Sequence, residues 1–412
     1  MTTIFTPFTT VSGVTLPNRL VKAAMAEDMA GGRMLPTNDI ITLYRAWAEG
    51  GTGLLITGHI MVDPAALSDP SDIAIVGQKN LTPFKLWADA VHAGGAKLMA
   101  QINHPGRQVQ SNMPGEPIAP SAIAVQLGSR RGLFSTPRPM TDNDIERTIE
   151  NFADTASLLA QSGFDGVEIH AAHGYLLSQF LSPLTNQRAD RWGGSLENRA
   201  RMLVEIVRRV RERVPEQFMV AVKLNSADFQ RGGFEPEDAK KVIEMLAPLG
   251  VDFVELSGGS YESPATTGRS ADERTMAREA YFLEMVADMV QTSPLPLMLT
   301  GGVRRMPVAQ QVIDSGIALV GMATALGAVP DLPKHWARGE ENAVASMPEI
   351  KIKSKLVASL ASLARVRFQF KRIARAKKTI PGVPPLLAVA REQALYALAL
   401  RRYSAWYRKN VR

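Results

Sequence analysis

Residues 197–224, ENRARMLVEIVRRVRERVPEQFMVAVKL, place a helix directly before a strand. Apolar residues recur at helical spacing in the first part, and FMVAVKL at 218 is an almost continuous apolar run. A second strand-like run, GVEIH at 166, precedes the helix. Strand, helix and strand in this order predict two parallel strands joined by a right-handed crossover.

The same alternation extends in both directions along the chain. Six more strand-like runs are RLVKAAM near 19, GLLIT at 53, AKLMAQI at 96, DFVEL at 252, PLMLTGG at 296 and IALVGMA at 317. Eight such units over residues 1 to about 340 predict a closed (β/α)8 TIM barrel, and a doubly wound open sheet is the alternative. The barrel is favoured because the count is eight and because no G-x-G-x-x-G follows any of these runs.

Two segments interrupt the alternation. Residues 4–16 are typical of a hairpin that caps the bottom of the barrel, and residues 103–140, rich in Pro, Gly and Ser, are typical of a long loop or lid.

Composition limits the chemistry. The chain has 412 residues, 45% of them apolar, and no cysteine, which excludes disulfides, thiolate metal sites, iron–sulfur clusters and a cysteine nucleophile. The N-terminus lacks the pattern of a secretory signal, and no apolar stretch reaches the length of a membrane span. We therefore expect a cytoplasmic protein.

The charge is divided unevenly along the chain. Residues 351–412 hold 16 of the 47 Lys and Arg residues but only one of the 40 acidic residues, Glu392. We therefore predict a catalytic domain over residues 1–340 and a basic, amphipathic helical extension over residues 341–412. The extension packs against an acidic barrel, its own or that of a partner subunit, or lies on an anionic membrane. Nucleic acid is the least favoured partner, because aromatic residues are not interleaved through the most basic part. We expect a homo-oligomer.

Polar residues cluster where the predicted strands end. In a barrel these ends meet on one rim, which carries the reactive groups. Small residues after the last two strands favour a bound phosphate, since bare backbone N–H groups can approach an anion closely. Each of these residues, taken alone, could instead have a purely structural role. His-x-x-His also resembles a pair of metal ligands, but no third ligand lies nearby in the sequence, so no metal is predicted. The residues are Gln101, His170, His173, Tyr175, Lys223, Asn225, Gly301, Gly302 and 321–324.

The segment HAAHGYLLSQFLSPLTNQRADRWGGSLENRARMLVEIV resembles the signature of the Old Yellow Enzyme family, the FMN-dependent ene-reductases. The resemblance extends to LPNRLVKAAM, MAQINHPGRQ, TGGVRRM and DLPKHWARG, and covers residues 4 to about 340. It implies FMN at the barrel mouth, NAD(P)H as reductant and a small activated alkene as substrate. His170 and His173 match the pair that polarises the substrate, acting as an oxyanion hole, and Tyr175 matches the proton donor.

The resemblance also implies which residues hold the cofactor. Lys223 matches a cation facing the flavin N1 and C2 carbonyl, where it raises the reduction potential. Gln101 matches an amide on the pyrimidine edge, and Gly58 a small residue that leaves room beside the ring. The backbone that lines the ring is matched by Ala23, Ala24, Met25 and Ala26.

Three positions depart from the family pattern. Thr324 stands where many relatives have a phosphate-binding Arg. The phosphate would then rely on Arg304 or Arg305 or on the Thr324 hydroxyl. A third option is the backbone N–H groups of two loops, one formed by Gly301, Gly302 and Val303 and the other by Met322, Ala323 and Thr324. Ala26 replaces a frequent Cys, Thr or Ser, and Asp28 replaces a frequent aromatic, which favours more polar substrates. The lack of cysteine separates the chain from the dienoyl-CoA reductases. A barrel with weakened flavin binding that serves as a scaffold is the alternative function.

Overall fold

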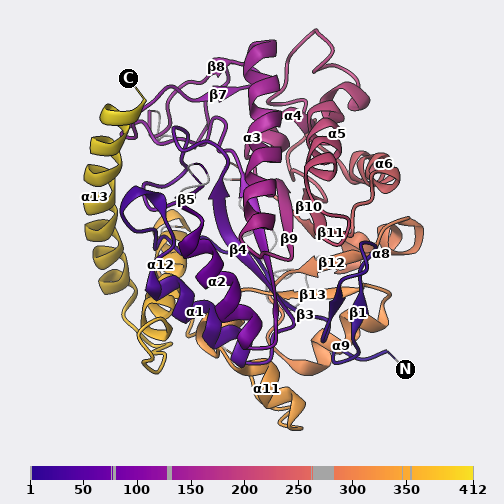
Figure 1. Ribbon diagram of the computed structural model, residues 1–412, viewed down its shortest axis with the longest axis vertical. Helices are drawn as coiled ribbons and strands as arrows, with labels where there is room; N and C mark the ends of the chain where they lie inside the picture. Colours follow the sequence, from indigo (N-terminus) through magenta and orange to yellow (C-terminus); the bar gives the residue numbers. More distant parts are fainter. Residues whose placement is uncertain are drawn as a thin grey trace.

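The computed structural model describes residues 2–75, 77, 80–127, 132–260, 262, 283–345, 347–352 and 355–411. Eight parallel strands of the described chain close into a barrel, because the last strand pairs with the first (Figure 1). The predicted barrel is therefore confirmed and the open sheet is wrong. The strands are β3 (Leu20–Lys22), β4 (Leu54–Met61), β6 (Lys97–Asn103), β9 (Gly166–Ala171), β10 (Met219–Asn225), β11 (Phe253–Ser257), β12 (Leu297–Thr300) and β13 (Leu319–Met322).

Helices surround the barrel. The segment that predicted the fold forms α5 (Leu196–Arg213) followed by β10, and Ser195 caps the helix by accepting from the Asn198 N–H. The other helices on the barrel are α1 (Asn38–Glu49), α2 (Thr82–Ala93), α3 (Asp142–Gln161), α4 (Leu176–Leu181), α6 (Pro236–Leu246), α8 (Leu283–Thr292), α9 (Met306–Asp314), α10 (Thr324–Ala328) and α11 (Leu332–Ala337), with 3-10 turns η1 (Gly32–Met34) and η3 (Ala247–Leu249).

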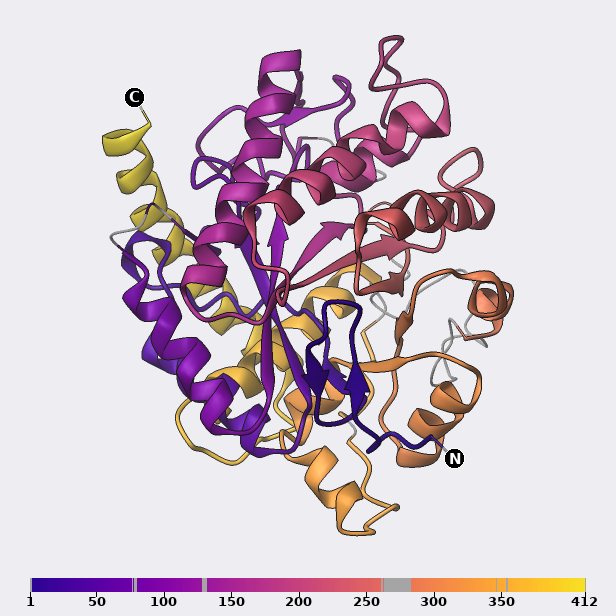
Figure 2. The same cartoon turned by 45° about the vertical axis from the view of Figure 1, so that its right-hand side comes forward.

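The barrel interior is filled with apolar side chains, including Met99, Met219, Phe253 and Met298. The hairpin of β1 (Phe8–Thr9) and β2 (Thr15–Leu16) lies across the end of the barrel where the strands begin (Figure 2), and Leu16 joins the interior cluster. The predicted hairpin cap is confirmed. Functional groups are thereby left to the opposite end of the barrel.

The segment 103–140 is mostly loop, as predicted, and its described part contains two short paired strands, β7 (Ile118–Ala119) and β8 (Arg138–Pro139). Residues 128–131 of this segment lie outside the described residues. A further short strand, β5 (Ile73–Ala74), pairs in parallel with the last residues of β4.

The C-terminal extension forms two long helices, α12 (Lys355–Ile373) and α13 (Pro385–Asn410), which lie against the barrel (Figure 1). Phe370 is fully buried and meets the Trp47 ring edge to face at 5.2 Å, and Tyr403 packs among apolar residues of the loops after β4 and β6. The extension therefore packs on its own barrel, one of the two predicted modes. None of the described helices is long and apolar enough to span a bilayer.

Candidate active site

A network of buried polar groups crosses the open end of the barrel. Lys223 Nζ donates to Glu255 Oε1 at 2.7 Å, and Thr300 Oγ1 donates to the same oxygen at 2.7 Å. Gln101 Nε2 donates to Glu168 Oε2 at 2.6 Å. These residues come from five strands, β6, β9, β10, β11 and β12. Gln101 and Lys223 are therefore buried together on one rim.

The electrostatics of this network follow from its burial. Burial raises the pKa of Glu168 well above its usual range, and the charge of Glu255 adds to the effect. Burial alone would raise the pKa of Glu255 and lower that of Lys223. Their mutual attraction outweighs burial, so the pKa of Glu255 is lowered and that of Lys223 is raised. The attraction between Lys223 and Glu255 therefore favours the ionised form of both, whereas burial favours the neutral form of Glu168.

His170 lies near the end of β9, a fully buried strand, and is 1% exposed. Its Nδ1 accepts the Ala172 N–H at 3.2 Å, so the ring proton sits on Nε2. Burial is the main reason that its pKa lies well below 6.5, and the neighbouring His173, His59 and Lys223 lower it further. His170 is therefore a neutral imidazole with one N–H to donate.

His173 is held in a strained turn. Its φ of 60° is left-handed, and the turn is fixed by Asn225 Oδ1, which accepts the His173 N–H at 3.1 Å, and by Gln108 Nε2, which donates to the His173 carbonyl at 2.7 Å. The next residue, Gly174, has a φ of 74°, which favours glycine. The imidazole Nε2 lies 2.8 Å from Ser257 Oγ.

Tyr175 precedes α4 and is 6% exposed. Its ring centroid lies 5.0 Å from that of His170, so the two predicted catalytic residues are neighbours. A third histidine, His59 at the end of β4, also lies 5.0 Å from Tyr175 and stacks on His170 at 5.5 Å. Burial lowers the pKa of His59 to about 4. The sequence did not indicate a role for His59, because it is a single His within an apolar strand.

The segment after β3 offers unused backbone donors. Ala23 is buried, whereas Ala24, Met25 and Ala26 are partly exposed. None of the backbone N–H groups of residues 24–28 donates to another residue within the described parts of the chain. Buried side-chain atoms of the same rim likewise lack described partners: Glu168 Oε1, Glu255 Oε2 and His59 Nδ1. Such leftover donors and acceptors fit a flat polar ring system such as the flavin of FMN.

Gly58 on β4 lets this segment approach closely. A Cβ there would lie 2.2 Å from Glu27 Oε2 and 2.4 Å from the Met25 carbonyl oxygen. Close packing against this segment therefore explains why position 58 is glycine. Its predicted place beside a flavin ring stays a prediction.

Two loops of small residues lie side by side at the ends of β12 and β13, because Thr300 pairs with Gly321. Gly302 has a φ of 69°, which favours glycine, and Val303 is buried behind it. Ala323 is partly exposed, and Thr324 is exposed at the start of α10. The predicted phosphate residues, Gly301, Gly302, Val303, Ala323 and Thr324, are therefore neighbours, with Arg304 and Arg305 exposed beside them.

Asp28 is not an open polar group of the pocket. Its side chain is 6% exposed and forms an ion pair with Arg367 of α12. Burial raises the pKa of Asp28 well above its usual range, although Arg367 opposes the shift. Nothing in the sequence indicated this partner, because it lies in the extension.

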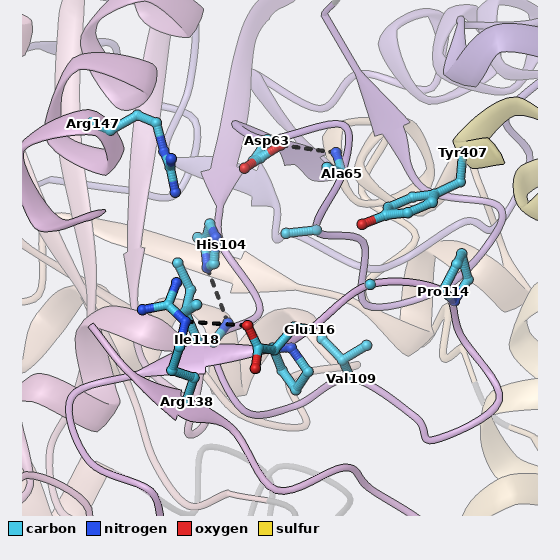
Figure 3. Close-up of a pocket in the computed structure, with 14 residues that line it drawn as sticks. Asp63, Ala65, His104, Val109, Pro114, Glu116, Ile118, Arg138, Arg147 and Tyr407 are labelled. Atoms are coloured by element: carbon cyan, nitrogen blue, oxygen red, sulfur yellow. Dashed lines mark hydrogen bonds and ion pairs between the residues drawn. The ribbon is translucent and has the colours of Figure 1, made fainter. Parts of the chain in front are cut away.

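A separate cavity of about 150 Å³ is lined by residues that include His104, Arg138 and Tyr407 (Figure 3). The His104 carbonyl accepts the Leu176 N–H at 3.1 Å, which connects the cavity wall to the start of α4, and Tyr407 of α13 lies across the cavity from His104. The described residues contain no cluster of His, Asp or Glu side chains suited to a metal ion.

Known proteins share this architecture and sequence. The model of the NADH:flavin oxidoreductase / NADH oxidase family matches residues 3–342. The chain is 38% identical over 353 residues to NADH-dependent flavin oxidoreductase iliE of Neonectria sp., which covers 80% of this chain and 46% of that protein. It is also 38% identical over 354 residues to NADH-dependent flavin oxidoreductase iccE of Talaromyces variabilis, covering 78% and 83%. The chain thus spans about half the length of the Neonectria relative.

Solved structures give the same result. The Old Yellow Enzyme homologue of Zymomonas mobilis superposes with a TM-score of 0.71 at 25% identity, covering 87% of this chain and 98% of that one. Morphinone reductase in complex with tetrahydroNAD gives a TM-score of 0.67 at 26% identity, covering 82% and 91%. The predicted resemblance is confirmed: the chain belongs to the NADH:flavin oxidoreductase / NADH oxidase family and is an oxidoreductase of the Old Yellow Enzyme type, which uses FMN and NAD(P)H.

Proposed function

We propose that this oxidoreductase reduces the activated C=C bond of α,β-unsaturated carbonyl or nitro compounds. The observation that carries the proposal is the clustering of His170, His173 and Tyr175 at one point of the rim. The His170 ring centroid lies 5.0 Å from that of His173 and 5.0 Å from that of Tyr175, and His170 and Tyr175 are buried while His173 is partly exposed. Uncharged hydrogen-bond donors beside a phenol suit a neutral substrate that gains negative charge on one atom and a proton on another.

The residues that would hold FMN come from the same rim. Ala23, Ala24, Met25, Ala26 and Gly58 would line the ring, with Gln101 and Lys223 at its polar edge. Gly301, Gly302, Val303, Ala323 and Thr324 would bind the phosphate through backbone N–H groups and one hydroxyl. When bound, FMN supplies the hydride for the alkene β-carbon. We propose residues 1–340 as the domain that contains this site.

His170 and His173 act on the substrate oxygen. The His170 tautomer is fixed by the Ala172 N–H, so its Nε2–H is available to a carbonyl or nitro oxygen. Each donor aimed at the developing negative charge is worth roughly 3 kcal/mol of transition-state stabilisation. The neighbouring pair of Lys223 and Glu255 adds no net charge to the site, because the two groups neutralise each other.

Tyr175 would donate the proton to the α-carbon. An ordinary phenol has a pKa near about 10 and is protonated at neutral pH, so it can serve as a general acid. Its position at the start of α4, tied through the Leu176 N–H to His104, holds the ring beside His170.

The visible absorption spectrum of the purified protein tests the proposal. Flavin bands should bleach on addition of NADH or NADPH and return on addition of a simple cyclic enone in the same cuvette. Bleaching without recovery across a panel of enones and nitroalkenes would contradict alkene reduction. A protein that stays colourless after added FMN would favour the scaffold alternative and show that Thr324 cannot replace the phosphate-binding Arg.

A further inference from the structure

The C-terminal extension contacts the rim of the active site. It lies beyond the family match, which ends at residue 342. Tyr403 Oη donates to the Pro64 carbonyl at 3.1 Å, after β4, and Tyr396 Oη lies 3.2 Å from Gln110 Oε1, after β6. Arg367 reaches the segment after β3. The extension therefore touches the loops that follow three barrel strands in succession.

Arg367 makes the contact nearest to the proposed flavin site. Its Nε donates to the Ala26 carbonyl oxygen at 3.1 Å. Its Nη1 forms an ion pair with Asp28 Oδ2 and lies 3.3 Å from Glu392 Oε1. One guanidinium therefore holds both the backbone and a side chain of the turn that follows β3.

Glu392 fixes the position of this guanidinium. It is the single acidic residue among residues 351–412, and its other oxygen accepts from Lys371 Nζ at 3.1 Å. A carboxylate on α13 thus binds two cations on α12. Because a paired guanidinium loses much of its rotamer freedom when the extension folds, Arg367 is presented to Ala26 in one orientation.

The contact sets the direction of the Ala26–Glu27 peptide. In a planar trans peptide the carbonyl and the N–H point to opposite sides, so an Ala26 carbonyl held by Arg367 turns the Glu27 N–H away from the extension. The far side of the turn is held by Glu27 Oε1, which accepts from Lys22 Nζ at 3.1 Å and from the Gly58 N–H at 3.1 Å. Asp28 has a left-handed φ of 51°, a conformation that needs such outside support.

We propose that Arg367 is a positioning residue for the flavin-facing segment 24–28, so that the extension forms part of the wall of the active site. This inference rests on the proposed FMN site. Arg367 acts through the backbone and through Asp28, and it aims the unused N–H groups of the segment at the cofactor.

The test compares FMN binding among variants of the full chain. Arg367→Met removes every hydrogen bond, Arg367→Lys keeps the charge, and Arg401→Met is the matched control because Arg401 is an exposed cation of the same extension. The measurements are the FMN dissociation constant by flavin fluorescence, the visible spectrum of the bound flavin, its midpoint potential and the unfolding temperature without FMN.

We expect Arg367→Met to bind FMN about ten-fold more weakly, because segment 24–28 loses the charge-assisted hydrogen bond that positions it, and to shift the spectrum and potential of the flavin. Arg367→Lys should restore part of the affinity, and Arg401→Met should match the wild type. Glu392→Gln, which frees the guanidinium without deleting it, should shift the spectrum in the same direction by a smaller amount.

Two results would overturn the inference alone. In the first, the wild type binds FMN, and Arg367→Met binds it with the same affinity and the same spectrum. Even if the unfolding temperature of Arg367→Met falls, this result would mean that Arg367 is only structural. If Arg367→Met fails to fold, an unchanged spectrum in Glu392→Gln has the same meaning. A wild type that binds no FMN would overturn the proposed function as well.

Discussion

The imidazoles of His170 and His173 meet edge to face, with ring centroids 5.0 Å apart and planes at 88°. Burial is the main reason that both pKa values lie well below that of a free imidazole, and the charge of Lys223 contributes to both shifts. Neither ring is charged near neutral pH. The rim therefore presents neutral donors, which suit a carbonyl or nitro oxygen better than a carboxylate.

The same burial makes the fold sensitive to acid. Burial lowers the pKa of His104 to about 4, whereas the unfolded chain has a His pKa of about 6.5. Between these values the unfolded state binds more protons than the folded state, so the free energy of unfolding falls as the pH falls. His104 alone should contribute a loss of about 3 kcal/mol between pH 6.5 and pH 4. Urea unfolding of wild type and His104→Gln at several pH values measures this, and equal pH slopes would show that His104 is not buried as a neutral group.

Tyr175→Phe should separate the two half-reactions. Removal of the phenol takes away the proposed proton donor but not the hydride source, so alkene reduction should slow by about 10²-fold or more while flavin reduction by NAD(P)H continues. Stopped-flow absorbance follows both steps. Tyr407→Phe, a phenol of the extension that lines the separate cavity, is the control and should leave both rates unchanged. Equal alkene reduction in Tyr175→Phe and wild type would exclude Tyr175 as the donor.

Lys223 and Glu255 should behave as one unit. Lys223→Met leaves a buried carboxylate without its 2.7 Å partner and should cost about 3–5 kcal/mol of stability. Lys223→Met with Glu255→Gln removes both charges and should cost less than Lys223→Met alone, because no unpaired charge stays buried. Denaturant unfolding of the two single variants and the double variant gives the coupling. Additive losses would mean that the two groups are independent.

The barrel could be predicted from the sequence because its signal is local. Each strand is a short apolar run, as in FMVAVKL, and each helix repeats its apolar residues within a few turns. His170, His173 and Tyr175 were found for a related reason, since they follow a strand directly and strand ends meet on one rim.

The partners of these residues could not be predicted in the same way. Lys223 meets Glu255 only because the two are opposite each other in the register of β10 and β11, which the sequence does not state. A Glu inside a buried strand does signal that a cation or a proton is required, and GVEIH and DFVEL both carry this signal. Arg367 and Ala26 are 341 positions apart, so their contact depends on the docking of the whole extension.

Docking of the extension should depend on Phe370. This side chain is fully buried between Trp47 and Gly327, where a Cβ on the glycine would lie 3.1 Å from the Phe370 ring. Phe370→Ala should therefore cost about 3–5 kcal/mol and loosen α12, since a large cavity replaces the ring. Phe368→Ala, on the same helix but only partly buried beside Arg391, should cost less. Thermal unfolding and limited proteolysis of α12 compare the two. Similar losses of stability in the two variants would mean that Phe370 does not anchor the extension. Selective cleavage of α12 in Phe370→Ala, together with weaker FMN binding, would connect docking of the extension to the active site through Arg367.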